Sequence, residues 1–197
     1  MLKSRIEPFR RLYRGCLVVL LISTAAYAQQ DLEREGYFEV RSATTELLSG
    51  VHTLDARLQL VLSSEALQAL EAGVPLTVEL QLEVIRTRRW VPDSLDAELK
   101  VRYELEYRPL SQRYIVRNVN TGNQESFATL YSALNTLGRV QALPIIDDAL
   151  LEPDKGYRLR IRALLNTQQY PPSLRFVFFW RSEWQLKSEW FEWSLER

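Results

Sequence analysis

Leu76-Thr77-Val78-Glu79-Leu80-Gln81-Leu82-Glu83-Val84 alternates apolar and polar side chains without a break. Successive side chains of a strand point to opposite faces, so this period predicts one face against a core and one face in water. Sheets with one wet face are typically antiparallel. The stretch therefore predicts an antiparallel sheet in which the leucines and valines pack inward.

Other parts of the chain repeat this period. Clear alternation covers 54–62, 99–107 and 157–165. Weaker strand patterns cover 38–48, 114–119 and 188–195. Ser49-Gly50 and the segment 109–112 have the composition of turns, which indicates that neighbouring strands form hairpins. In total the chain is expected to hold about seven or eight strands.

Two short helices interrupt the strands. Ser63-Ser64 can cap a helix over 65–72, with Leu67 and Leu70 facing inward. A second helix is predicted over 127–137, because its apolar residues recur at helical spacing up to Gly138. The following segment, 140–151, is weakly patterned and reads as a connector with one helical turn.

Together these elements predict a mainly β protein, an antiparallel β-sandwich of about seven to eight strands with two short helices. A closed β-barrel is the alternative architecture.

The C-terminal stretch 173–193 is rich in aromatic residues and contains four of the five tryptophans. These are Trp180, Trp184, Trp190 and Trp193. Large aromatic side chains bury about 150–250 Å² each, so the stretch is expected to complete the core. The alternative is an aromatic-lined pocket for a small ligand. The part from 174 to 184 fits either a strand or a helix.

The N-terminus has the features of a bacterial secretory signal. Basic residues precede the apolar run that begins at Cys16, and Ala26-Tyr27-Ala28 forms a small-x-small cleavage site. The sequence predicts a signal peptide over 1–28, cut after Ala28, followed by a flexible lead-in over 29–36 and a single domain over 37–197. The apolar run is shorter than the roughly 20 residues of a spanning helix, although an uncleaved anchor is the alternative. A periplasmic protein of a Gram-negative bacterium, without a stable membrane span after cleavage, is therefore expected.

Removing 1–28 takes away five of the 25 basic residues and one of the 25 acidic residues, which leaves 20 and 24. It also removes Cys16, the only cysteine, so no disulfide can form within the remaining chain. A mildly acidic exported chain without a basic block is not expected to bind nucleic acid.

Residues with catalytic potential are few. His52 is the only histidine, and the predicted turn beside it favours a surface position. One histidine without cysteine does not provide an ordinary zinc site, and no nucleophile or nucleotide-binding motif is present. The connector carries Asp147, Asp148, Glu152 and Asp154, which are expected to be a solvated acidic segment rather than calcium ligands. We therefore expect no enzyme activity, no cofactor and no metal.

Arginines form two groups. Arg86, Arg88 and Arg89 precede Trp90, while Arg158, Arg160 and Arg162 share one face of a predicted strand. Opposite acidic strand faces such as Glu79/Glu83 or Glu104/Glu106, the second group would form cross-strand ion pairs. If the two groups met, they would instead form a patch for an acidic partner. The composition of Arg86, Arg88, Arg89 and Trp90 is typical of partner-binding residues.

Four segments together resemble the DUF4390 family of exported proteobacterial proteins, which has no assigned activity. They are 66–76 (ALQALEAGVPL), 86–90 (RTRRW), 107–114 (YRPLSQRY) and 188–193 (SEWFEW). The resemblance extends over nearly the whole chain after the signal. The sequence departs from the family pattern at 170–175. Here Tyr-Pro-Pro-Ser precedes Leu-Arg, where the family is expected to have Leu-Pro before Leu-Arg. The departure affects only a local turn. The resemblance implies a genetic neighbourhood with a membrane sensor histidine kinase and no catalytic residues.

Two functions follow as expectations. The first is a non-enzymatic interaction module whose partner is an envelope or membrane protein, such as a sensor histidine kinase. The second is a small-ligand or lipid-binding protein that uses the aromatic residues as a cavity lining. A continuous apolar cavity would favour the ligand-binding function, whereas a filled core with an exposed Trp90 or Trp190 would favour the interaction module.

Overall fold

The computed structural model describes residues 34–166 and 186–195. The predicted signal peptide, most of the lead-in, Trp180, Trp184 and the segment 174–184 lie outside the described residues.

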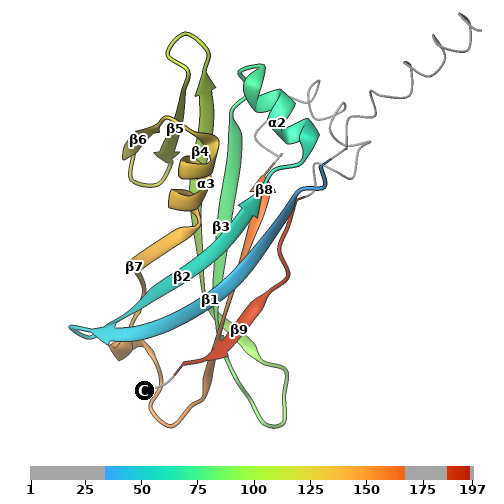
Figure 1. The fold of residues 1–197 in the computed structure, drawn as a ribbon. Helices are drawn as coiled ribbons and strands as arrows, with labels where there is room; N and C mark the ends of the chain where they lie inside the picture. Colours follow the sequence, from blue (N-terminus) through green and yellow to red (C-terminus); the bar gives the residue numbers. More distant parts are fainter. Residues whose placement is uncertain (1–33, 167–185, 196–197) are drawn as a thin grey trace, which may run out of the picture. The chain divides into compact units, whose positions relative to one another are not determined.

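The described strands form two antiparallel sheets (Figure 1). The three-stranded sheet has the order β1 (Tyr37–Leu48), β2 (Val51–Val61) and β7 (Arg139–Asp147). The six-stranded sheet has the order β6 (Gln124–Phe127), β5 (Arg113–Asn118), β4 (Ser94–Arg108), β3 (Leu76–Arg86), β8 (Tyr157–Asn166) and β9 (Phe191–Ser194). The predicted mainly β, sandwich-like architecture is confirmed, and the sheets do not close into a barrel. The described strands number nine, slightly more than predicted.

The core lies between the two sheets. Residues that alternate in the sequence point into it, including Leu54, Leu58 and Leu60 from β2 and Val78 and Leu80 from β3, all at most 6% exposed. Burial of apolar surface stabilises a fold by about 25 cal/mol per Å². This layer of buried side chains is therefore the main source of stability. The period-2 signal thus identified the inward faces of β2, β3, β4 and β8 correctly.

The polar face of β3 differs from the expectation of a wet face. Glu79 is 3% exposed and Glu83 is 9% exposed. β3 is a central strand of the six-stranded sheet, and arginines from its two neighbours cover the carboxylates: Arg102 of β4 and Arg160 of β8. Burial here follows from long side chains that lie flat over the sheet.

The first helix, α2 (Ser64–Glu71), forms as predicted. The hydroxyl of Ser63 caps it by accepting a hydrogen bond from the backbone N–H of Ala66. Its fully buried residues are Ala66 and Leu70, whereas Leu67, predicted to face inward, is only partly buried. Gly73 follows the helix with a φ of +85°, which a residue with a Cβ adopts only with strain.

The structure differs from two predictions around the second helix: the position where the helix starts and the nature of the segment after it. The helix α3 (Leu130–Leu137) begins after its cap Thr129, so Phe127 is not helical and instead ends the short strand β6. The connector predicted over 140–151 is largely β7, which pairs with β2, and only η1 (Asp148–Leu150) is a helical turn. Pro144 is tolerated because β7 is at the edge of its sheet.

Candidate functional site

Two loops at one end of the sandwich enclose a hollow of about 550 Å³. They are the β3–β4 loop, 87–93, and the loop 151–156 that leads into β8. The backbone N–H and the hydroxyl of Thr87 both donate to the carbonyl of Gly156 at 2.9 Å. A Cβ on Gly156 would lie 2.7 Å from the Thr87 hydroxyl, so glycine permits this close approach. The two loops are therefore held together by two hydrogen bonds from Thr87 to the Gly156 carbonyl.

The four predicted partner-binding residues, Arg86, Arg88, Arg89 and Trp90, all line this hollow. Arg86 differs from the others, because its guanidinium forms ion pairs with Asp96, at 3.1 Å, and with Glu152. These contacts connect the end of β3 to both β4 and the second loop. Arg86 thus has a structural role in the walls of the hollow.

Arg88 and Arg89 are exposed, and within the described part of the chain neither guanidinium has an ion-pair partner. The backbone N–H of Arg88 donates to Oδ1 of Asp93 at 3.0 Å. The other oxygen of Asp93 accepts from Arg158 at 3.1 Å, which anchors the loop to β8. The Arg89 guanidinium lies 5.5 Å from the ring centre of Trp90, a cation–π contact. Hydrogen bonds thus fix the base of the loop, while the guanidinium groups of Arg88 and Arg89 and the indole of Trp90 stay exposed.

Apolar side chains are also exposed at this end. Trp90 is 87% exposed, and Val91, Leu95 and Leu150 are between 55% and 74% exposed. Of these four residues, Trp90 and Val91 line the hollow itself. Single exposed apolar residues are ordinary, but exposed apolar side chains grouped at one site are typical of an interaction surface.

Beneath the loops, a small second core supports the hollow. It contains Val84, Leu151, Tyr157, Leu159 and Leu195. The hydroxyl of Tyr157 accepts a hydrogen bond from the backbone N–H of Glu152 at 3.0 Å. The second loop is therefore packed from below rather than suspended over the sheet.

His52 is buried at 1% exposure, so its predicted surface position is wrong. Its Nε2 lies 2.9 Å from Oδ1 of Asp148 in η1. The backbone N–H of Asp148 also donates to the carbonyl of Gly50 at 2.9 Å, which ties η1 to the β1–β2 turn. The neighbouring turn suggested exposure, but η1 folds over the imidazole and covers it.

Three of the four acidic residues of the segment from 147 to 154 have separate structural partners. Asp147 caps η1 by accepting from the N–H of Ala149, Asp148 contacts His52, and Glu152 pairs with Arg86. Asp154 has a φ of +67° in the turn before β8. Over residues 34–166 and 186–195, no three His, Cys, Asp or Glu side chains gather in a way that could hold a metal ion.

The arginine row on β8 forms the predicted cross-strand pairs. Arg160 pairs with Glu83 at 2.6 Å, and Arg158 pairs with Glu192 at 3.2 Å. Arg162 donates to Gln81 at 2.7 Å. The second arginine group is therefore engaged by partners in the sheet and, through Arg158, by Asp93 of the β3–β4 loop. None of its three residues lines the hollow that Arg88 and Arg89 border.

Glu79 shows the electrostatic effect of this arrangement. Burial by itself raises the pKa of Glu79, but hydrogen bonds from Arg102, Gln81 and Asn166 outweigh burial and lower the pKa below its ordinary value. The Arg102 bond is 2.7 Å long. Glu79 is thus held as a carboxylate by its neighbours, which is the chemistry of a structural ion pair.

The described tryptophans of the C-terminal stretch have different surroundings: Trp190 directly precedes β9, and Trp193 lies within it. Trp190 stacks against the guanidinium groups of Arg160 and Arg162, at 4.4 and 4.2 Å. Trp193 packs against the core and donates its Nε1–H to Thr45 at 2.8 Å. Neither side chain lines the hollow at the loop end.

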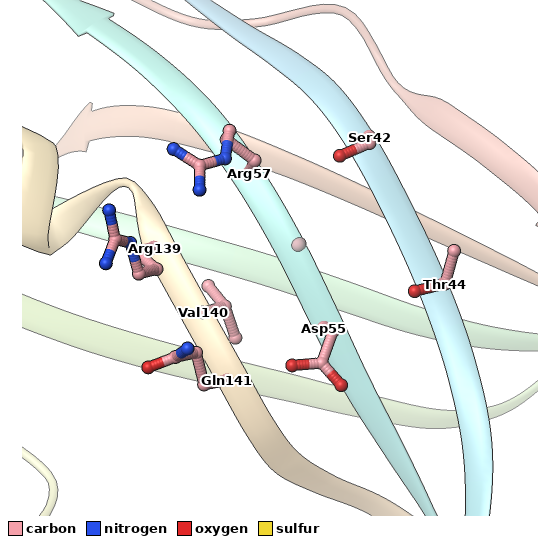
Figure 2. Close-up of a pocket in the computed structure, with 8 residues that line it drawn as sticks. Ser42, Thr44, Asp55, Arg57, Arg139, Val140 and Gln141 are labelled. Atoms are coloured by element: carbon pink, nitrogen blue, oxygen red, sulfur yellow. The ribbon is translucent and has the colours of Figure 1, made fainter.

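A second hollow, of about 280 Å³, lies on the three-stranded sheet (Figure 2). Its polar side chains come from all three strands, and the sequence reading missed it because β7 was not recognised. They are Ser42, Thr44, Asp55, Arg57, Arg139 and Gln141. The alternation of Arg139, Val140 and Gln141 directly after Gly138 is the signal that could have revealed the strand.

Neither α2 nor α3, the α-helices of the described residues, has the length and apolar character needed to cross a membrane. No curated protein and no solved structure matches the chain. A family model described as "Domain of unknown function (DUF4390)" matches residues 36–194, which spans every strand and helix described above. The chain therefore belongs to the DUF4390 family.

Proposed function

We propose that this protein is exported to the periplasm and acts there as a non-enzymatic protein-interaction module. Its partner would be an envelope or membrane protein, for which a sensor histidine kinase is the first candidate. The observation that carries the proposal is the hollow at the loop end, where Arg88, Arg89 and Trp90 stand exposed above a braced base.

The composition of this site supports a protein partner. Tryptophan and arginine are the residues most enriched among those that dominate binding energy at protein interfaces. Val91, which also lines the hollow, adds exposed apolar area, and Lys155 adds a further positive charge. A complementary partner surface would present carboxylates to the arginines and an apolar pocket to the indole.

The hydrogen bonds that fix the β3–β4 loop favour partner binding, because little conformational entropy of the loop is lost when the partner binds. Thr87, Asp93 and Gly156 already fix the backbone on both sides of Arg88. Since ordering a flexible loop on binding costs free energy, a loop held in place before contact retains more of its contact energy as affinity.

The filled core also favours the interaction module over the ligand carrier. Among the described residues, most of the buried apolar side chains of the two sheets form one packed cluster, and further apolar side chains such as Tyr103 and Phe191 are partly buried against it. Trp90, by contrast, is largely exposed. A filled core together with an exposed Trp90 is the combination expected of an interaction module.

The test is crosslinking in living cells. Tagged full-length protein is expressed with its N-terminal segment, crosslinked and isolated from the envelope, and its partners are identified by mass spectrometry. The proposal expects one dominant membrane-protein partner. It also expects that the triple variant Arg88→Ala/Arg89→Ala/Trp90→Ala loses that partner while keeping the wild-type fold.

The matched control is Arg108→Ala/Arg117→Ala, which removes two exposed arginines from the far part of the six-stranded sheet. It should retain the partner. Capture that is equal in the triple variant and the wild type would show that the loop end is not the binding site. The intact mass of the same sample shows whether residues 1–28 have been removed.

A further inference from the structure

Arg57 of β2 and Arg139 of β7 are directly opposite each other in the three-stranded sheet. Like charges in this position repel each other and destabilise a sheet. Both side chains are exposed, and within the described residues neither forms an ion pair. Six arginines of the six-stranded sheet, by contrast, each contact at least one carboxylate; they are Arg86, Arg102, Arg108, Arg117, Arg158 and Arg160. The Arg57–Arg139 pair is therefore a local concentration of positive charge: the hollow that it lines also holds the carboxylate of Asp55, but within the described residues neither arginine is ion-paired with it.

The surroundings of this pair are polar and concave. Figure 2 shows both guanidinium groups turned to the same side of the sheet, with Gln141 beside Arg139 and Ser42 across from Arg57. Asp55, the acidic residue of the hollow, accepts the backbone N–H of Ala142 at 3.3 Å, where β7 has a φ of +45°. Guanidinium and hydroxyl groups can donate several hydrogen bonds to one group of oxygens, as phosphate recognition requires.

On its other side, Arg57 borders a larger groove of about 580 Å³. Leucines from the end of β2 and the residue after it, from α2 and from α3 line one part of this groove; they are Leu60, Leu62, Leu67 and Leu134. Besides Arg57, its polar lining includes Arg34, Arg41, Gln59 and Asn135, and among the described residues no carboxylate lines it. A volume of this size is ordinary for a small-molecule site. One arginine thus belongs to both the polar hollow and the apolar groove.

We propose that this surface binds an anionic amphiphile, with its phosphate head group between Arg57 and Arg139 and its acyl chain in the groove beside α2 and α3. The two positive charges match a phosphate monoester, and the apolar groove continues from the point where the head would lie. This site is on the three-stranded sheet and the helices, so it is independent of the interaction proposed at the loop end.

The experiment measures binding of dihexanoyl phosphatidic acid, below its micelle concentration, to the full chain by calorimetry at low salt. Two comparators separate the parts of the ligand: glycerol 3-phosphate has the head alone, and dihexanoyl phosphatidylcholine has the same chains without net charge. We expect phosphatidic acid to bind more tightly than either comparator.

Three variants test the residues. Arg57→Gln and Arg139→Gln should each weaken phosphatidic acid binding by about tenfold or more, as expected for loss of a charge-assisted hydrogen bond. Leu67→Gln should weaken phosphatidic acid binding but leave glycerol 3-phosphate binding unchanged. Arg108→Gln, an exposed arginine outside the site, is the control and should change neither. Circular dichroism establishes that each variant is folded.

Three outcomes would overturn the proposal. The first is absence of phosphatidic acid binding to the wild type. The second is binding that both arginine variants keep at wild-type strength, which would place the ligand elsewhere. The third is glycerol 3-phosphate binding as tight as phosphatidic acid binding, which would show that the groove does not hold the chain.

Discussion

The indole Nε1–H of Trp193 donates a hydrogen bond to Oγ1 of Thr45 over 2.8 Å, and so links β9 of one sheet to β1 of the other. The contact joins residues 148 positions apart in the sequence. Trp193 also packs against both core clusters, with Phe191 6.1 Å away between ring centres. The short last strand thus closes one side of the sandwich.

Trp193→Phe should lower the free energy of unfolding by about 1 kcal/mol through loss of the hydrogen bond, and Trp193→Ala by about 3–5 kcal/mol through the added cavity. Urea denaturation measures both. Thr45→Val combined with Trp193→Phe should cost less than the sum of the single changes, because both remove the same bond. Simple additivity would show that the bond contributes nothing to stability.

Acidification should destabilise the protein partly through Glu79. Its pKa is lowered in the folded state, so the carboxylate contributes stability above its ordinary pKa of about 4.3, and this is lost as the pH falls through the folded value. Between about pH 5 and pH 3, the stability of Glu79→Gln should therefore fall less steeply than that of the wild type.

The control for this measurement is Glu125→Gln, which changes an exposed carboxylate on β6. Its unfolding free energy should follow the wild-type pH profile. If Glu79→Gln and the wild type lost stability in parallel, the hydrogen bonds from Arg102 and its neighbours would not be what holds the carboxylate ionised.

Arg86 and Arg88 line the same hollow, but we expect Arg86 to contribute to the stability of the fold and Arg88 only to partner binding. Arg86→Ala removes the guanidinium that pairs with Asp96 and Glu152 and should destabilise the fold by about 1–2 kcal/mol. Arg88→Ala should change stability by no more than about 0.5 kcal/mol, as is usual for exposed side chains. Thermal unfolding distinguishes them, and equal losses would contradict the division of roles.

His52 should support the loop end from within the core. His52→Ala removes a buried ring and its contact with Asp148, which should cost about 2–4 kcal/mol. Because η1 leads into the loop 151–156, amide exchange in that loop should accelerate more than in β5. Uniform acceleration across the chain would mean that His52 acts on global stability alone.

The sequence allowed the inward faces of the long strands to be predicted, since an unbroken period of two leaves little choice of orientation. β6 was missed because Gln124–Phe127 is short and does not alternate. β7 was missed because Pro144 and the positive φ of Ala142 disturb its pattern. Phe127 continued the helical spacing of α3 by coincidence, and the cap at Thr129 marks the true start.

The site was predictable only in part, for a related reason. Arg86, Arg88, Arg89 and Trp90 are neighbours in sequence, so their common location followed from composition and a turn. The loop 151–156 meets them through tertiary pairing of β3 with β8, which no local pattern reveals. The position of Arg57 opposite Arg139 likewise depends on the register between β2 and β7, and the sequence did not indicate β7.

The margins of the three-stranded sheet bear on how the protein behaves at high concentration. An open strand margin can recruit the same margin of another molecule and start polymerisation. Here β7 carries Pro144 and the kink at Ala142, and β1 has a bulge between Val40 and Ser42 followed by exposed Ser42 and Thr44. These irregularities leave no long flat template for another chain. Pro144 and the irregular backbone at Ala142, which made β7 hard to predict from the sequence, therefore also disfavour aggregation through this edge.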